Sequence, residues 1–487
     1  MSAIPAGLEE WIEEEARFAA SAMGAAISAT HIVKHRPGFG SIITPRPGSI
    51  VASPVLASYD PDPDYFFHWF RDSAIVIDAL RVSLAEGWAD ARALDRFREF
   101  VAFGRSLLAL DGADLVRRAD LREKTETSFL QYLRADAEIA AVSGQAVLAE
   151  ARVNPDATLD FTRWARPQTD GPALRILALM RWLRAGPAID DALSAGVAEL
   201  VRCDVDFTLC RADEPSFDIW EEERGRHYYT QLAQAEALGS AAGWLAENGD
   251  ETRARACRIA AAEILARLGA FWDARAGYYL SRIGVAGGRS EKALDIAVVL
   301  AIVRAGRAAG PHSILDPKAQ ATLAALEEHF ESEYAINHSR AAGFGPALGR
   351  YPNDVYYSGG AYYFATLGAA EFYFKLAHAL LGGATMPVTE ENERFRRRLA
   401  IAEEKASGQP IAAAALKSGD AIMETVRRFT PASGELSEQF DRTTGAQTSA
   451  KQLAWSYAAF ITAAASRRRP CLAIRGSGLG ERVGGRG

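Results

Sequence analysis

Six loops that combine aromatic and charged residues divide this chain into helical stretches. The loops lie at Trp69–Asp72, Trp164–Asp170, Asp218–Glu222, Glu291–Asp295, Arg350–Tyr357 and Glu435–Asp441. Successive loops are roughly 55 to 95 residues apart, which is the length of two helices with their connections. Six helical hairpins, each presenting one loop at the same end, predict an all-α fold of the (α/α)6 barrel type. A helical solenoid would give similar spacing, but with clearer internal repeats than this sequence has.

The helices themselves are predicted from alanine- and leucine-rich stretches whose apolar residues recur at helical spacing. They cover residues 11–28, 73–85, 90–110, 172–185, 189–208, 229–247, 251–272, 293–305, 317–333, 360–381, 390–406, 420–429 and 448–466. Evidence for strands is sparse, and only Ser41–Thr44 and Tyr278–Ser281 are candidates. After the last predicted helix, residues 467–487 are rich in arginine and glycine, which is typical of a flexible tail.

Charge and composition exclude several classes of protein. The 487 residues carry a net charge of −7, whereas nucleic-acid-binding domains are usually basic. No apolar stretch is long enough to cross a membrane, and no basic segment followed by an apolar one marks a secretory leader. The four cysteines form neither a C-x-x-C pair nor a zinc-binding pattern with histidines. We therefore expect a cytoplasmic, monomeric protein that binds neither nucleic acid nor membranes.

Two of the loops, Phe217–Glu222 and Glu435–Asp441, place carboxylates beside aromatic or apolar side chains. This combination suits sugars, because sugar rings stack their apolar faces on aromatic rings and bond their hydroxyls to charged groups. Cleavage of a glycosidic bond needs two carboxyl groups, one that gives a proton and one that takes a proton.

Five motifs carry a resemblance to a known family. They are Asp64–Ser73, Trp164–Arg175, Asp218–Glu222, Gly349–Tyr357 and Leu436–Asp441. Each is a weak signal alone, but together, in this order and spacing, the chain resembles the glucoamylases, the inverting α-glucosidases of glycoside hydrolase family 15. The similarity extends from the first helix to Trp455–Phe460. It implies a single (α/α)6 catalytic domain over residues 1–466, followed by the tail at 467–487.

The resemblance also implies roles for individual residues. Glu221 matches the general acid, and Glu438 matches the general base. Arg71 and Asp72 match residues that grip the 4- and 6-hydroxyls of the terminal glucose. Further matched positions line the sugar pocket or brace the acid-bearing loop: Tyr65, Trp69, Trp164, Asp218, Trp220, Glu222 and Arg350. Arg175 lies within a predicted helix and is expected to support Asp170.

The implied activity is exo-acting hydrolysis of α-glucans or malto-oligosaccharides that releases β-D-glucose, with no metal or organic cofactor. Two alternatives remain open. The same machinery could act on another linkage, such as the α-1,6 bond of isomaltose or the α,α-1,1 bond of trehalose. The scaffold could also serve as a catalytically silent glycan-binding or regulatory module, although the presence of both Glu221 and Glu438 favours an enzyme.

Overall fold

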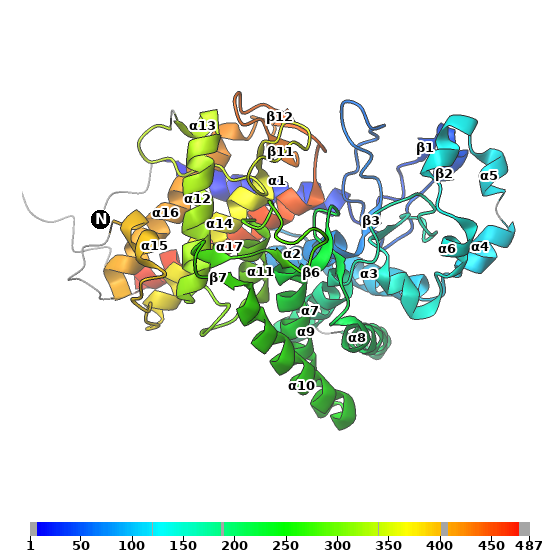
Figure 1. Cartoon of the computed structure of the whole chain (residues 1–487), viewed down its shortest axis with the longest axis horizontal. Coiled ribbons are helices and arrows are strands. Elements are labelled where there is room, and N and C mark those ends of the chain that lie inside the picture. The colour runs from blue at the N-terminus through cyan, green and yellow to red at the C-terminus, as the bar shows by residue number, and fades with distance from the viewer. Residues whose placement is uncertain (1–6, 119, 187–188, 339, 401–407, 477–487) are drawn as a thin grey trace, which may run out of the picture.

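Six helices form a closed inner ring in the computed structural model, which describes residues 7–118, 120–186, 189–338, 340–400 and 408–476 (Figure 1). The inner helices are α2 (Phe70–Ala85), α7 (Asp170–Ala185), α9 (Tyr228–Glu247), α11 (Ala297–Ala305), α14 (Tyr363–Leu381) and α17 (Ala454–Gly476). Each packs on the next in chain order, and α17 packs on α2 to close the ring.

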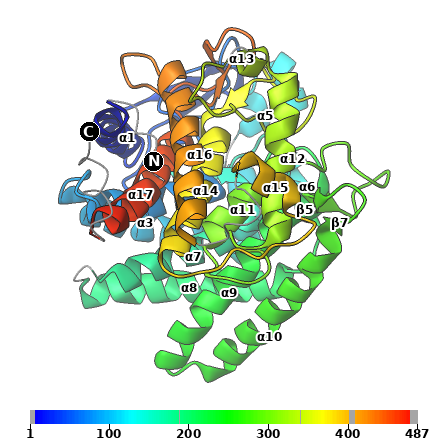
Figure 2. The same ribbon diagram turned by 90° about the vertical axis from the view of Figure 1, so that its left-hand side faces the viewer.

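Six further helices surround this ring and run between its members in the chain. They are α1 (Leu8–Ala25), α3 (Arg92–Leu107), α8 (Asp191–Arg211), α10 (Glu251–Leu268), α12 (Pro317–Glu333) and α16 (Gly408–Phe429). Figure 2 shows α8 and α10 crossing below the rest of the molecule, while α16 runs beside α14, on which it packs. The predicted (α/α)6 barrel is confirmed.

Burial explains why the inner helices lack a polar face. Inner helix α14 is buried on nearly every side, from Tyr363 to Leu380, because it contacts α11, α16 and α17 at once. Such a helix is apolar all round, whereas outer helices such as α3 keep a polar, solvent-facing side. Among the described residues, no helix combines the length and the apolar character that a bilayer crossing requires.

A buried ion pair joins α7 to α8. The guanidinium of Arg175 donates two hydrogen bonds of 2.7 Å to the carboxylate of Asp204, and both side chains are almost fully buried. We expected Arg175 to support Asp170, and this expectation is wrong, because the partner of Arg175 is Asp204. Sequence spacing alone could not identify Asp204, which lies on the next helix.

Replacing Asp204 with alanine is expected to lower the free energy of unfolding by about 3–5 kcal/mol, because it leaves Arg175 buried without a counter-charge. Urea unfolding of the whole chain measures this. The matched control is Glu199→Ala on the same helix, which removes an exposed pair with Arg105 and should cost less than about 1 kcal/mol. Equal losses in the two variants would contradict the assigned role of the Arg175–Asp204 pair.

The connection between α3 and α7 folds into a lobe of small elements, seen at the right of Figure 1. It contains α4 (Gly112–Arg118), α5 (Leu121–Lys124), α6 (Asp136–Ala140) and β4 (Arg152–Val153), beside the hairpin of β1 (Lys34–Arg36) and β2 (Ser41–Ile43). Elsewhere, α13 (Ala335–His338) and α15 (Glu393–Arg398) are single short helices. Short 3-10 helices are found at Pro37–Phe39, Thr127–Tyr132, Gly144–Ala149 and Gly269–Phe271.

Short antiparallel strands join the loops that precede the inner helices. Strand β3 (His68–Trp69) pairs with β4, directly before α2. Strands β5 (Ser216–Phe217), β6 (Arg224–His227) and β9 (Arg282–Ile283) form a sheet before α9. Strands β10 (Ala361–Tyr362), β11 (Gln439–Phe440) and β12 (Gln447–Thr448) form another before α14 and α17, and β7 (Trp272–Asp273) pairs with β8 (Tyr278–Tyr279). These pairings hold the six loops together at one end of the ring.

The last inner helix continues to Gly476, ten residues beyond the predicted end at Ser466. Two of its basic residues pair with carboxylates elsewhere in the molecule. The Arg467 guanidinium donates to Asp420 at 2.6 Å, and Arg468 pairs with Glu13 and Glu86 at 2.8 Å. The first part of the predicted tail is thus ordered helix, whereas residues 477–487 lie outside the described part of the chain. Helix α16 begins at Gly408, twelve residues before its predicted start.

Candidate active site

Glu221 lies in a tight turn between β5 and β6, and its backbone has a φ of 66°. Such a left-handed conformation is uncommon for residues other than glycine, so the surrounding structure must hold it in place. The brace is Asp218, whose carboxylate accepts a hydrogen bond of 2.8 Å from the Glu222 amide. The other oxygen of Asp218 accepts a bond of 2.5 Å from the buried Arg282. Asp218 therefore supports the loop that carries Glu221.

The carboxylate of Glu221 accepts hydrogen bonds from three side chains on two other loops. Its Oε1 lies 2.7 Å from Nε1 of Trp69 and 3.3 Å from Nη2 of Arg71. Its Oε2 accepts the indole N–H of Trp164. Trp69, Arg71 and Trp164 are thus brought together around Glu221.

Trp220 does not contribute to this group of donors. Its ring stacks on Phe364 and Trp455, with centroids 6.0 and 6.4 Å away, and its N–H donates to Asp295 at 2.9 Å. Trp220 therefore belongs to an aromatic wall beside the site. The tryptophans that contact Glu221 are Trp69 and Trp164.

Glu438 lies beside β11 and is buried, with 8% of its surface exposed. One oxygen accepts the hydroxyl of Ser449, and the other lies 3.4 Å from the hydroxyl of Tyr65, which in turn is 2.8 Å from that of Tyr356. Burial raises the pKa of Glu438 to about 7, while the Ser449 hydrogen bond and the charge of Arg350 act in the opposite direction. Glu438 can therefore exchange a proton near neutral pH.

One short segment contacts both carboxyl groups. Tyr65 bonds Glu438, Trp69 bonds Glu221, and the two aromatic rings are 5.3 Å apart between centroids. Asp72, three residues after Trp69, interacts electrostatically with both glutamates. The two predicted catalytic residues therefore flank the same segment, although they are separated by more than two hundred positions in the chain.

Arg71 and Asp72 keep polar atoms that the protein does not satisfy. Among the described residues, Nε of Arg71 and Oδ2 of Asp72 are buried without a hydrogen-bond partner, and they lie 3.4 Å from each other. Nε1 of Trp455 is a third such atom, and the Arg71 guanidinium stands over the Trp455 ring. Unsatisfied buried polar atoms are costly, and at functional sites a ligand commonly completes them. Asp72 lies in the first turn of α2.

Burial raises the pKa of Asp72 to about 6, although Arg71 opposes this effect. A carboxylate that stays charged at neutral pH, next to a guanidinium, offers both an acceptor and donors to the hydroxyl groups of a sugar.

Glu222 and Arg350 form a second group beside the first. Glu222 accepts the Tyr351 hydroxyl at 2.6 Å, Lys292 at 2.7 Å and Arg350 at 3.2 Å. Arg350 is itself held by two bonds to Asp354. A cavity of 530 Å³ opens against this group, lined also by Tyr356 and Tyr357. Aromatic side chains around a polar centre are typical of carbohydrate contacts.

Several residues of the site were not singled out from the sequence. They are Arg282, Asp295, Tyr351, Tyr356, Ser449 and Trp455. Ser449 had no signal because a serine next to an alanine gives no hint of a distant partner. Asp295, Tyr351 and Tyr356 lie within the six aromatic and charged loops, and the two tyrosines also lie within the Gly349–Tyr357 motif, so the sequence did hold a signal for them.

The described residues contain no group of three or more histidine, cysteine or acidic side chains arranged to hold a metal ion. The site instead offers two carboxyl groups, Glu221 and Glu438, with aromatic and guanidinium neighbours.

Comparison with known proteins adds the family. Residues 39–465 match the family model described as glycosyl hydrolases family 15. The chain is 30% identical to glucoamylase-1 of Arthroderma benhamiae over 437 residues, which cover 87% of this chain and 65% of that protein. It is 26% identical to the glucoamylase of Blastobotrys adeninivorans, with coverage of 86% and 68%. It thus spans about two thirds of the length of these relatives.

Among solved structures, the family 15 glucoamylase from Hypocrea jecorina superposes with a TM-score of 0.76 at 27% sequence identity, covering 95% of this chain and 72% of that one. The match to the family model and the common (α/α)6 fold agree over almost the whole chain. The chain belongs to glycosyl hydrolases family 15.

Proposed function

We propose that this protein is an inverting, exo-acting α-glucosidase that releases β-D-glucose from the non-reducing ends of α-glucans or malto-oligosaccharides. The observation that supports the proposal is that Glu438 contacts Tyr65 and Glu221 contacts Trp69, two adjacent rings of one short segment. Membership of a glycosidase family and similarity to proteins named glucoamylase support the substrate class.

In this mechanism Glu221 is the acid and Glu438 the base. Glu221 donates its proton to the glycosidic oxygen as the bond from that oxygen to the anomeric carbon breaks. A water molecule attacks the anomeric carbon from the opposite face, and Glu438 takes a proton from it. Inversion requires room for this water, so the carboxyl groups of inverting enzymes stand about 6.5–9.5 Å apart. Each turnover returns one proton to Glu221 from solvent and removes one from Glu438.

Arg71 and Asp72 would position the terminal glucose. Their buried, unsatisfied atoms would bond the sugar's 4- and 6-hydroxyls, each charge-assisted bond contributing roughly 1.5–3 kcal/mol. Tyr65, Trp69 and the wall of Trp220 and Trp455 would stack against the sugar ring. Beyond the bond that is cleaved, Trp164, Glu222 and Arg350 would contact the rest of the substrate.

The proposal is tested with a panel of maltose, isomaltose, trehalose, kojibiose and soluble starch, scored by released glucose. The account predicts that kcat/KM is highest for maltose or starch. Preference for trehalose or isomaltose would keep the mechanism and replace the proposed linkage. Absence of hydrolysis on every member of the panel would contradict an enzymatic function and favour a glycan-binding module.

The raised pKa of Glu438 gives a prediction for the pH dependence. A base must be deprotonated, so kcat/KM is expected to fall as the pH drops below about 7, where Glu438 gains its proton. Replacing Ser449 with alanine removes a hydrogen bond that favours the charged form, which raises the pKa of Glu438 further. At about pH 6 the variant should lose roughly three- to tenfold in kcat/KM, with little change at about pH 8.

The matched control for this pH profile is Ser456→Ala. Ser456 donates a hydrogen bond of 2.8 Å to the backbone carbonyl of Ser437, the residue directly before Glu438. It does not contact the Glu438 carboxylate. The acid limb of the profile should stay in place in this variant. A limb that shifts equally in both serine variants, or in neither, would show that Ser449 does not tune Glu438.

A further inference from the structure

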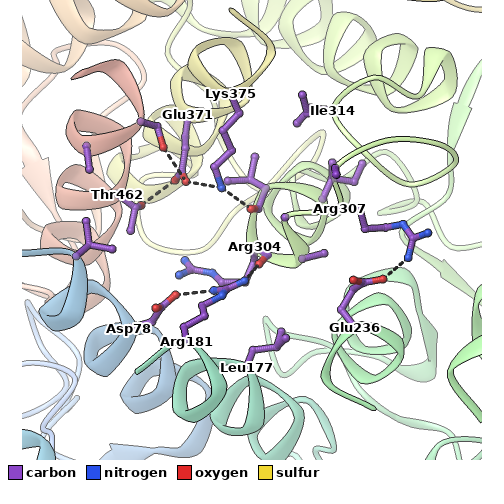
Figure 3. A pocket seen from close by; sticks show the side chains of 18 of the residues that line it. Asp78, Leu177, Arg181, Glu236, Arg304, Arg307, Ile314, Glu371, Lys375 and Thr462 are labelled. Atoms are coloured by element: carbon purple, nitrogen blue, oxygen red, sulfur yellow. Dashed lines mark hydrogen bonds and ion pairs between the residues drawn. The ribbon is translucent and has the colours of Figure 1, made fainter. Parts of the chain in front are cut away.

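A second cavity of 600 Å³ lies at the end of the inner ring opposite Glu221 and Glu438, and Figure 3 shows side chains that line it. It is formed where α2, α7, α11 and α14 end, together with residues from the middle of α9 and α17. None of its lining residues belongs to the candidate active site. Its size falls within the range of small-molecule sites, about 300–1,000 Å³.

The lining is strongly cationic, although the chain as a whole is acidic. Seven of the lining residues are arginine or lysine, and three are acidic. The cations are Arg81, Arg181, Arg184, Arg304, Arg307, Lys375 and Arg469. No phenylalanine, tyrosine or tryptophan is among the lining residues that the structure describes, so the cavity lacks the large stacking surface that a second sugar site would need.

The three acidic residues are already paired. Asp78 accepts bonds from Arg81 at 2.8 Å and Arg181 at 2.5 Å, and Glu371 pairs with Lys375 at 2.9 Å. Glu236 pairs with Arg307. Figure 3 shows the Asp78–Arg181, Glu236–Arg307 and Glu371–Lys375 pairs around the cavity. The acids therefore account for four of the cations.

Part of the positive charge also compensates helix ends. Carbonyl groups at the C-terminal end of a helix carry partial negative charge. Lys375 donates to the carbonyl of Val303 at 2.7 Å, and Arg181 donates to that of Arg304. Pairing with acids and with helix ends thus accounts for Arg81, Arg181, Arg307 and Lys375. It leaves Arg184, Arg304 and Arg469 unexplained.

Arg304 is the clearest surplus cation. Within the part of the chain that the structure describes, its guanidinium has no hydrogen-bond partner and no carboxylate within ion-pair distance. At longer range it interacts electrostatically with several groups, among them Asp78 and Glu371, which lie on either side of it. Arg469 on α17 likewise forms no ion pair with a described residue and raises the positive potential next to His378. Arg184 has only a long bond of 3.4 Å to a carbonyl.

From this geometry we infer that the cavity binds a small phosphorylated anion, with Arg304 and Arg469 as its principal ligands. A guanidinium presents several N–H donors in one plane and bonds phosphate oxygens in pairs, which suits a dianionic group better than a monovalent one. The hydroxyl-bearing part of a phosphate ester could lie against Ser240, whose side chain also lines the cavity. The inference is independent of the proposed catalytic function.

Isothermal titration of the whole protein at fixed ionic strength tests this site, with inorganic phosphate, glucose 6-phosphate and neutral glucose as separate probes. We expect saturable binding of one or both phosphorylated probes. Arg304→Gln should weaken it by roughly tenfold or more, and Arg469→Gln severalfold. Binding of inorganic phosphate alone would restrict the ligand to the free anion. Glucose distinguishes this site from the sugar pocket, because its binding should not respond to Arg304→Gln.

The control variant is Arg255→Gln, which removes one positive charge from the exposed side of α10, away from the cavity. It should bind phosphorylated probes like the unmodified protein. Equal weakening by Arg255→Gln and Arg304→Gln would show that only overall charge matters and would overturn the inference. Failure of both phosphorylated probes to bind would overturn it as well. Since the Arg304 guanidinium has no hydrogen-bond partner among the described residues, Arg304→Gln should keep the original melting temperature. Arg469→Gln provides a second, exposed position.

Discussion

Replacing Glu438 with glutamine is expected to lower kcat on maltose by roughly 10²–10⁴-fold, the usual contribution of a general base. Glutamine keeps the size of the side chain and can still contact Ser449 and Tyr65, but it cannot take a proton from water. Binding of the substrate should survive, so KM should change much less than kcat. Steady-state kinetics with the purified variant measures both constants.

Stability separates a catalytic effect from misfolding. Burial disfavours the charged form of Glu438 and raises its pKa to about 7, so the folded state is penalised as the pH rises from the ordinary glutamate range through 7. Glutamine removes this penalty, and at about pH 8 the variant should melt at the same or a higher temperature than the unmodified protein. A catalytic loss without a stability loss is the expected signature.

The matched control is Glu435→Gln on the same loop. Glu435 accepts bonds from Gln452 and Ser433 and has no contact with the predicted reaction centre. Its variant should retain activity within a few-fold. Near-normal turnover by Glu438→Gln, or equal losses in both variants, would contradict the assignment of Glu438 as the base.

Replacing Glu221 with alanine is expected to lower kcat on maltose by a similar factor, roughly 10²–10⁴. Alanine is the better test here than glutamine, because both oxygens of Glu221 accept N–H donors and an amide nitrogen would face one of them. Arg71 keeps Asp170 and Asp72 as partners, so the substitution leaves no cation unpaired.

The choice of substrate separates the acid from the base. α-Glucosyl fluoride has a leaving group that departs with little help from an acid. Glu221→Ala should therefore recover most of its activity on this substrate, to within roughly tenfold of the unmodified protein. Glu438→Gln should remain impaired on the fluoride, because water still needs a base. The same loss on both substrates in Glu221→Ala would contradict its role as the acid.

The order and spacing of the aromatic and charged loops predicted the six-hairpin ring correctly, because each inner helix needs one loop at the same end. The residues that contact Glu221, namely Trp69, Arg71 and Trp164, lie within short motifs that the sequence displays, while their roles remain predictions. These features repeat along the chain or lie within short motifs, which is why a sequence can reveal them.

Features that depend on distant partners were not predictable in the same way. Arg467 and Arg468 resemble the start of a basic tail until α16, α1 and the end of α2 supply their carboxylates. Arg282 gives no local signal, yet it braces Asp218 and Asp295 from a strand more than ten residues from either of them. Two-residue strands such as β3 and β11 are likewise too short for a periodic pattern.

The stereochemistry of the first product tests the pairing of Glu221 and Glu438 most directly. Proton NMR of methyl α-maltoside with the unmodified protein follows the anomeric signals, and only the cleaved residue can appear as free glucose. The account predicts that β-glucose appears first and that α-glucose grows in only at the rate of mutarotation. An early α-glucose signal would mean that the configuration is retained. It would contradict the proposal that Glu438 activates a water molecule on one face of the sugar while Glu221 donates a proton on the other.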